Sequence, residues 1–356
     1  MKKFLTIILS FCLIFVLAMS GCSCAPESLL EFNDSLTENI KTEKLVYDVS
    51  FERIYKDIQR SKDLNESLMP VYTNGTFTIE YDGAGKSLPA GVQTNINFDN
   101  ISAYKYVKSV LEINVEVSGK TFNDKIISEV YFYPSEWAFA PVYSTTTIKN
   151  TYIALNSSKV DYSHNIYKYS TTYSTDKYVL TKQYYDTAEL TDEQVNAIDI
   201  TNMEQAKLKA MSGNGNAHEY SLRRTIDNVQ LIFAIRNLSL SKDASTNLLA
   251  TTFMYDEPKE LIIANNSETI ITLTQLNYND TVQNNLDMPV KNIQFGLSGT
   301  NYIGANKYIS IQKSEVGVVK NNALPIEYAE SVIENSSYST LGALVYKLKE
   351  VSIVNK

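Results

Sequence analysis

Cys22 is the residue whose chemistry the sequence predicts most directly. It follows Ser20-Gly21, at the end of an uncharged apolar run from Phe4 to Met19. The pair Lys2-Lys3 precedes the run, so the order is that of a secretory signal peptide: a basic start, an apolar core and a small-residue cleavage site. We expect cleavage directly before Cys22 and attachment of lipid to its thiol.

The stretch Leu17 to Cys22 resembles a bacterial lipoprotein signal, in which the cysteine is diacylated on sulfur before cleavage. Met19 stands where leucine is usual, and Cys24 is a poorer alternative acceptor. The resemblance implies a signal peptide at residues 1–21 and a diacylglyceryl anchor in the cell membrane, with the chain on its extracytoplasmic face. Two acyl chains anchor stably because each buried methylene contributes about 0.8 kcal/mol.

The sequence shows no pattern of a catalytic or metal site. The two histidines, His164 and His218, lie far apart, and no G-x-S-x-G elbow occurs. The stretch Asp161 to Asn165 lacks the turn glycine and bidentate acid of a calcium loop, and Gly83 to Ser87 lacks the first glycine and the helix of a phosphate-binding loop. We therefore expect a protein that is not an enzyme and holds no metal or cofactor.

The net charge limits which partners the protein can bind, and the cysteines indicate the compartment in which it is found. The net charge is −8, and loss of Lys2-Lys3 makes the mature chain more acidic, which argues against binding nucleic acid. Of the three cysteines, Cys12 leaves with the signal peptide and Cys22 carries lipid, so Cys24 has no partner for an intramolecular disulfide. This pattern suits a Gram-positive surface protein.

The densest aromatic segment runs from Tyr131 to Tyr143 and contains the single tryptophan, Trp137. Trp and Tyr offer large apolar faces with a polar tip, which suits gripping an acyl chain or stacking on a sugar. We name Tyr133, Trp137 and Phe139 as candidate ligand-binding residues. The alternative is that they are core residues beside one packed loop.

Alternating polar and apolar residues predict strands before and after a central insert. Residues 22–44 are polar and predicted as a flexible tether, and one β-rich domain is predicted at 45–356. The clearest hairpin pairs Tyr104–Val117 with Thr121–Tyr133 across Ser118-Gly119. The other predicted strands are Leu45–Glu52, Thr76–Tyr81, Thr151–Tyr162, Ile166–Tyr173, Lys177–Tyr185, Leu248–Tyr255, Glu260–Ala264, Thr269–Leu276, Val290–Leu297, Tyr302–Lys313, Leu324–Glu330 and Leu341–Val354.

A helical insert is predicted near residues 190–238. Capping boxes at Thr191 and Thr201 predict helices over Asp192–Ile198 and Asn202–Ser212. The second helix would place Met203 and Met211 on its apolar face, and we name both as candidate ligand-binding residues because methionine adapts to irregular ligands. The apolar centre of Thr225–Leu238 is compatible with a buried helix or a strand.

The second half, from about Thr225 to Val351, resembles a family of bacterial envelope proteins of unknown function. Their fold is similar to that of the lipoprotein-localisation carriers, an antiparallel half-barrel with helices on its concave face. The resemblance depends on Asp227, Arg236 and the pattern Leu324-Pro325-Ile326-Glu327 followed by Gly342 and Leu344. The fold class we predict is mainly β (α+β), one large curved antiparallel sheet or half-barrel with a short helical insert packed on its concave face.

Two functions fit these features. The first is a lipid-anchored, extracytoplasmic, non-enzymatic protein that binds a hydrophobic or amphipathic envelope molecule in the concavity of its sheet. The second is a surface recognition module for cell-wall glycan or protein that uses exposed tyrosines. The direction in which the tyrosine side chains point discriminates between them.

Replacing the predicted acceptor thiol tests the anchor. We expect Cys22→Ala to abolish incorporation of a metabolically supplied fatty-acid analogue, because the thiol accepts the diacylglyceryl group, whereas Cys24→Ala should leave the label unchanged. Undiminished label in Cys22→Ala would move the acceptor elsewhere.

Overall fold

The computed structural model describes residues 37–53, 69–94, 96, 103–133, 139–155, 160–222, 225–251, 257–297, 308–334 and 339–356. They all belong to one compact unit, Glu31–Lys356. The predictions for Cys22 and Trp137, and for most of the tether, lie outside the described residues.

The described residues form sixteen strands and a few short helices. The strands are β1 (Ile40–Arg53), β2 (Val71–Lys86), β3 (Tyr104–Val117), β4 (Lys120–Phe132), β5 (Pro141–Leu155), β6 (Val160–Tyr173), β7 (Lys177–Tyr185), β8 (Leu208–Ala210), β9 (Asn216–Glu219), β10 (Thr225–Asp227), β11 (Ser245–Thr251), β12 (Lys259–Tyr278), β13 (Thr281–Leu297), β14 (Tyr308–Gln312), β15 (Pro325–Glu334) and β16 (Ser339–Asn355). The helices are α3 (Asp192–Asn196), η3 (Ile200–Asn202), η4 (Gln205–Lys207), η5 (Asn228–Gln230) and α4 (Leu231–Arg236).

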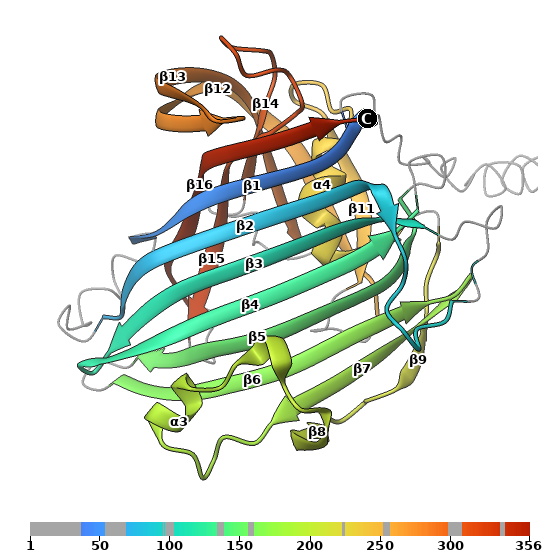
Figure 1. The fold of residues 1–356 in the computed structure, drawn as a ribbon, viewed down its shortest axis with the longest axis vertical. Helices are drawn as coiled ribbons and strands as arrows, with labels where there is room; N and C mark the ends of the chain where they lie inside the picture. The colour runs from blue at the N-terminus through green and yellow to red at the C-terminus, as the bar shows by residue number, and fades with distance from the viewer. Residues whose placement is uncertain are drawn as a thin grey trace, which may run out of the picture. The chain divides into compact units, whose positions relative to one another are not determined.

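All sixteen strands belong to one sheet (Figure 1). Its order is β10-β11-β12-β13-β14-β15-β16-β1-β2-β3-β4-β5-β6-β7-β8, with β9 also paired to β7. The first and last strands, β1 and β16, are antiparallel neighbours at its centre, from Ile40 opposite Asn355 to Arg53 opposite Gly342. The pairs are antiparallel apart from β10–β11 and a short contact of β12 with β16. The mainly β fold class is confirmed.

The β3–β4 hairpin shows how the sequence sets the register. Thirteen residue pairs join the strands without a shift, from Lys105 opposite Phe132 to Val117 opposite Lys120. Ser118 and Gly119 both have positive φ, 54° and 72°. A two-residue turn of this kind matches the twist of the strands it connects, and the predicted hairpin is confirmed.

Two strand boundaries differ from the prediction. β5 begins at Pro141 and ends at Leu155, so Tyr162 belongs to β6 rather than to the same strand as Thr151. The predicted strands Glu260–Ala264 and Thr269–Leu276 are one strand, β12. The polar residues between them do not end it, because β12 continues to pair with β13 across a single register shift between Asn265 and Ser267.

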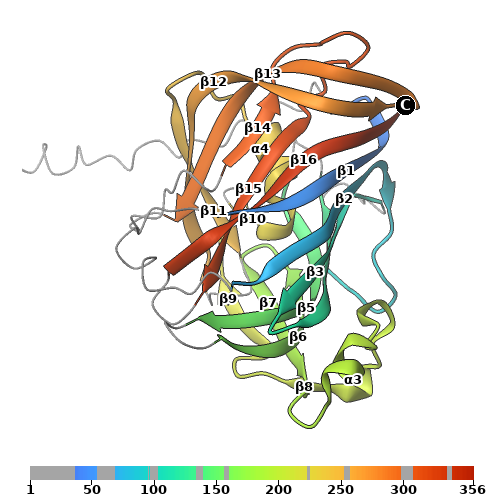
Figure 2. The ribbon, with the colours of Figure 1, turned by 90° about the vertical axis from the view of Figure 1, so that its left-hand side faces the viewer.

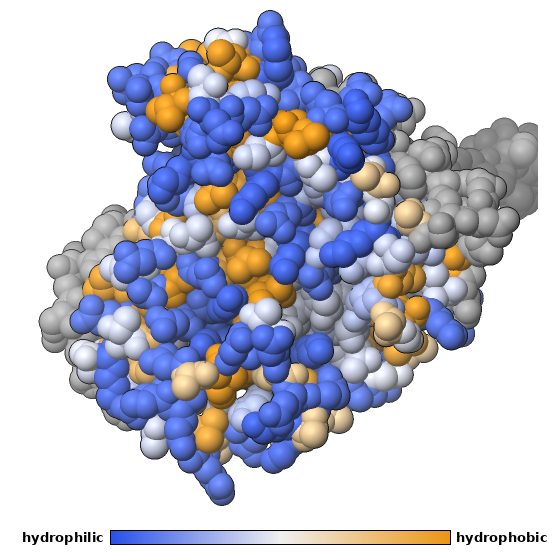
Figure 3. Space-filling view, in the orientation of Figure 1, coloured by the Kyte–Doolittle hydropathy of each residue, from blue (hydrophilic) through white to orange (hydrophobic). Residues whose placement is uncertain are grey.

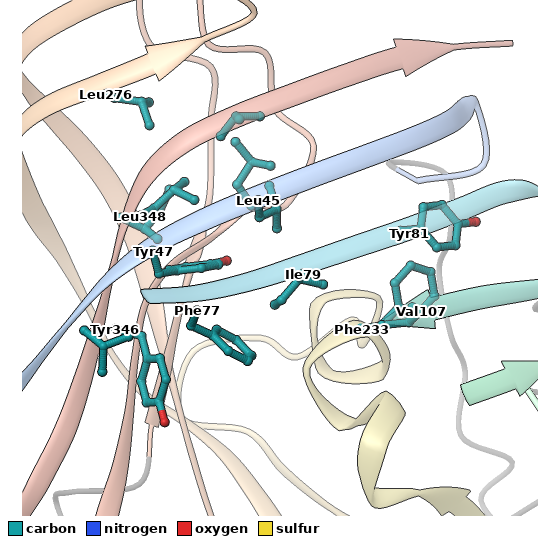
Figure 4. Close-up of a cluster of buried hydrophobic side chains, with 14 of the residues drawn as sticks. Leu45, Tyr47, Phe77, Ile79, Tyr81, Val107, Phe233, Leu276, Tyr346 and Leu348 are labelled. Atoms are coloured by element: carbon teal, nitrogen blue, oxygen red, sulfur yellow. The ribbon is translucent and has the colours of Figure 1, made fainter. Parts of the chain in front are cut away.

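Helix α4 packs against the concave face of the sheet, which curves round it (Figure 2). The Phe233 ring stacks on Tyr81 of β2 at a centroid distance of 4.7 Å and lies 5.3 Å from Phe132 of β4. Figure 4 shows the Phe233 and Tyr81 side chains beside the apolar cluster over β1, β2 and β16. The apolar centre of the ambiguous segment is therefore a buried helix.

A buried ion pair joins α4 to β1. Arg236 donates to both carboxylate oxygens of Glu43, at 2.5 and 3.1 Å, and to the Asn322 carbonyl oxygen at 2.7 Å. The two charged side chains are only 2% and 1% exposed. Burial lowers the pKa of Arg236, but the Glu43 carboxylate outweighs this effect and raises it overall. Arg236 is therefore charged although its side chain is buried.

A second buried polar group, Asp227, precedes α4. Its carboxylate accepts hydrogen bonds from Ser144 of β5 at 2.6 Å and Tyr173 of β6 at 2.5 Å, and caps the following turn at the Val229 amide. Tyr173 is also hydrogen-bonded to Thr251 of β11. Since β10 and β11 lie at one end of the strand order and β6 lies near the other, Asp227 and Tyr173 connect the two sides of the sheet.

The first predicted helix of the insert is confirmed as α3, but it lies on the opposite face of the sheet from α4. Thr191 and Gln194 form its capping box. Lys149 donates to the carbonyl oxygens of Asn196 and Ile198, whereas Ser144 of the same strand reaches Asp227. Because β5 has no register shift between Ser144 and Lys149, these side chains point to opposite faces. Within the predicted insert, α4 therefore lies on the concave face as expected, whereas α3 lies on the other face.

The prediction of a second helix over Asn202–Ser212 is wrong. Asp199 caps the short η3 by accepting from the Thr201 amide, and Glu204 has extended backbone angles. Residues Leu208–Ala210 then pair with β7 as strand β8. The open edge of β7 thus supplies backbone partners that replace the helical hydrogen bonds.

None of the helices in the described ranges is long and apolar enough to cross a membrane.

Breaking the buried ion pair should cost much more than breaking an exposed one. Glu43→Gln leaves the Arg236 charge buried without its counter-ion, and we expect the free energy of unfolding to fall by about 3–5 kcal/mol. Asp48→Asn removes the partner of Lys349 in a pair that is 64% and 56% exposed, and should cost at most about 1 kcal/mol. Urea denaturation measures both, and equal losses would contradict a special role for the buried pair.

Candidate functional site

The predicted aromatic residues of the Tyr131–Tyr143 segment lie in the core where the structure describes them. Tyr133 and Phe139 are fully buried. The Tyr133 hydroxyl donates to the Ile96 carbonyl oxygen at 2.7 Å, and the Phe139 carbonyl oxygen accepts from Gln230 at 2.8 Å. Both residues therefore contact the core of the domain and not the rim of a binding site.

The two candidate methionines pack against different hydrophobic clusters. Met203 packs against a cluster around Val195 and Ile200, whereas Met211 packs against a different cluster that contains Tyr178. This separation follows from the absence of the predicted helix, which would have aligned them. The structure therefore does not assemble the predicted set into one site.

The tyrosines are mostly enclosed. In the part of the chain that the structure describes, Tyr152 is the only exposed tyrosine, at 40%. The face in Figure 3 is mostly hydrophilic, with apolar side chains in small separate areas. The described tyrosines therefore form no exposed stripe of the kind that the recognition module would use.

A cavity of about 160 Å³ is the candidate functional site. Its walls are mainly apolar and come from β2, β3, β4, β5 and β16. The apolar and aromatic lining residues are Tyr72, Leu111, Ile113, Ile126, Tyr152, Ile153 and Leu344. The polar lining residues are Asp124, Lys125, Asn150 and Thr151.

The curvature of the sheet creates this cavity. Leu344 of β16 and Tyr152 of β5 are separated by β1, β2, β3 and β4 in the strand order. In a flat sheet five strand spacings would put them about 24 Å apart. Because they line one small cavity, the sheet curls strongly here and the cavity lies on its concave side.

Asp124 is the one acidic side chain of the cavity wall. Its two oxygens accept from the Thr151 hydroxyl at 2.8 Å and the Thr151 amide at 2.9 Å. The backbone pairing of β4 with β5 ends at Lys125 opposite Lys149. The hydrogen bond from the Thr151 amide to the Asp124 side chain connects the two strands beyond this point. Burial raises the pKa of Asp124 to about 6, although the Thr151 hydrogen bonds and the more distant Lys149 charge act in the other direction.

The histidines lie outside this cavity. His164 is 3.1 Å from Asp192 of α3, which also accepts from Lys120 at 2.5 Å and Tyr162 at 3.1 Å. These contacts hold α3 against the sheet. His218 packs beside the Tyr178 ring. Among the described residues, no group of three or more His, Cys, Asp or Glu side chains could hold a metal ion.

Comparison with known proteins identifies no family for this chain. No protein-family model matches the chain, and the search of curated proteins finds no match. Among solved structures, the chain is similar to a β-barrel-like protein of the domain of unknown function DUF1849 from Brucella abortus. The two are 8% identical, the match covers 89% of this chain and 100% of that chain, and the TM-score is 0.46. A likeness at this level supports no argument about function.

Asp124 was not singled out from the sequence, because it lies in a strand with alternating polar residues. The available signal was its place two residues before the apolar pair Ile126-Ile127, which puts it on the same face as Ile126. Only the pairing of β4 with β5 and the approach of β16 show that this face is enclosed there.

The raised pKa of Asp124 predicts a specific pH dependence. The unfolded carboxyl loses its proton near its ordinary pKa of 3.8, whereas the native carboxyl keeps it to about pH 6. As the pH rises through this window, the wild type should lose up to about 3 kcal/mol of stability relative to Asp124→Asn. Urea denaturation at pH 4 and pH 7 measures this difference. An equal difference at both pH values would contradict the raised pKa.

Proposed function

We propose that this protein is a lipid-anchored, extracytoplasmic binding protein that takes the apolar part of an amphipathic envelope molecule into its concave cavity. The observation that carries this proposal is the mainly apolar cavity walled by five strands, with Asp124 as its acidic group. Small-molecule sites have this composition, with apolar walls and a few placed polar groups. The anchor at Cys22 would hold the site close to the membrane surface.

The cavity volume limits what can enter. Apolar cavities of roughly 150 Å³ bind benzene, so the volume of about 160 Å³ suits one ring or a short alkyl group rather than a whole acyl chain. Burial of such a group contributes about 25 cal/mol per Å² before association costs are subtracted. We therefore propose weak and reversible binding of one end of the molecule.

α4 and the cavity occupy different parts of the concave face. Along β2, Tyr81 contacts α4 whereas Tyr72 lines the cavity. Nine residues of extended strand span about 30 Å. The buried ion pair of α4 therefore stabilises one part of the sheet without filling the cavity, which supports a binding role for the remaining space.

Filling the cavity should abolish binding of an apolar probe. The protein can be prepared from residue 22 onward with Cys22→Ser, so that no acyl chain or detergent is present. We expect saturation transfer from this protein to 1-hexanol by NMR, and its loss in Ile126→Trp, because the indole would occupy the cavity.

Ile270→Trp is the matched control, since Ile270 is 62% exposed on β12 and the same ring there leaves the cavity open. Saturation transfer should persist in this variant. If 1-hexanol does not bind the unmodified cavity, or if both tryptophan variants bind it equally, the cavity is not the binding site.

A further inference from the structure

The Asp124 carboxylate has unused acceptor capacity beside the cavity. A carboxylate accepts about four hydrogen bonds, and Asp124 receives two, both from Thr151. Its side chain lines the cavity, so the remaining lone pairs are within reach of a molecule that enters it.

The neighbouring cations are engaged elsewhere. Lys125 of β4 pairs with Glu112 of β3 at 2.7 Å. Lys149 of β5 donates to the carbonyl oxygens of Asn196 and Ile198, at 3.2 and 3.1 Å. Neither lysine forms an ion pair with Asp124, so among the residues described here no cation contacts Asp124 directly, although the more distant Lys149 charge lowers its pKa.

Two aromatic rings line the cavity. Tyr72 of β2 is stacked on Phe51 at 4.8 Å, which fixes its ring, and Tyr152 of β5 lies beside Asn150. A cation is attracted to the face of an aromatic ring as well as to a carboxylate. The cavity thus combines a desolvated negative charge, aromatic rings and a short apolar space.

We propose that the cavity selects a primary ammonium group attached to a short alkyl chain or a ring, with the ammonium at Asp124. This inference rests on the proposed function and names the class of ligand for the same site. The ammonium supplies the counter-ion and hydrogen-bond donors that Asp124 lacks, and the chain or ring fills the apolar space. A carboxylate of the same length is repelled by Asp124, and an alcohol gains no charge pairing.

Three probes of equal length separate charge from apolar burial. We expect hexylammonium to bind about tenfold or more tightly than 1-hexanol at pH 7.5, because hydrogen bonds to charged groups contribute more than neutral ones. Hexanoate should bind more weakly than both. Dissociation constants come from NMR titration of the protein from residue 22 onward with Cys22→Ser.

Asp124→Asn should abolish the preference for hexylammonium over 1-hexanol, because the amide carries no charge to pair with the ammonium. Asp287→Asn is the matched control, because Asp287 also accepts from a threonine hydroxyl, that of Thr272 at 2.6 Å, but lies on β13 away from the cavity. This control should retain the full preference for the amine.

The wild type provides a second test that needs no substitution. At pH 5 Asp124 is mostly protonated, since its pKa is raised to about 6, and the preference for hexylammonium should largely disappear. The other titratable or charged groups around Asp124 are Tyr72, Glu112, Lys125, Lys149 and Tyr152. The change is assigned to Asp124 by its absence in Asp124→Asn.

The outcomes distinguish this inference from the proposed function. Binding of 1-hexanol without a preference for hexylammonium, or a preference that persists in Asp124→Asn, would overturn the inference and leave the proposed function intact. Failure of all three probes to bind would overturn both. A preference that disappears in Asp124→Asn and at pH 5 supports both.

Discussion

The ion pair of Arg236 with Glu43 is the interaction on which the rest of the concave face depends. Both charged side chains are almost completely buried, and the cost of removing them from water is offset only because they pair with each other. Their pairing fixes the end of α4 against β1, at the centre of the strand order. Asp227, just before α4, fixes its beginning through Ser144 and Tyr173. The helix is therefore held by polar contacts at both ends and by Phe233 between them.

This arrangement explains why a six-residue helix is stable. So short a helix has little stability of its own, and most of it comes from packing. Phe233 stacks on Tyr81 and Phe139 packs against it, so the helix buries its apolar residues against the sheet. The helix in turn gives the sheet an interior to curve round. The cavity lies where this helix does not reach.

The sequence predicts local features of this fold better than long-range ones. The β3–β4 hairpin and the capping box of α3 follow from a few neighbouring residues and are present in the structure. The helix predicted over Asn202–Ser212 is absent because the edge of β7 competes for its backbone groups. Local capping signals contain no information about such an edge.

The candidate site could not be predicted for a similar reason. Asp124 and Tyr152 belong to neighbouring strands, but Leu344 lies almost two hundred residues further along and reaches the same cavity only through the curvature of the sheet. Tyr133 and Phe139, which the sequence suggested as ligand-binding residues, are instead part of the core. The aromatic character of these two residues predicts correctly that they are buried. It does not show whether they are buried against the core or against a ligand.

The pairing of β1 with β16 has a consequence for how the chain reaches this structure. Ile40 lies opposite Asn355, so the centre of the sheet joins the two ends of the folded unit. Closing so long a loop costs conformational entropy before any contact is gained, and folds dominated by such contacts form slowly. Neither half can complete its central pairing before the last strand has been synthesised. Until then the edges of β1 and β15 that face β16 remain open to wrong partners, and a chain of this topology benefits from being kept unfolded until β16 is available.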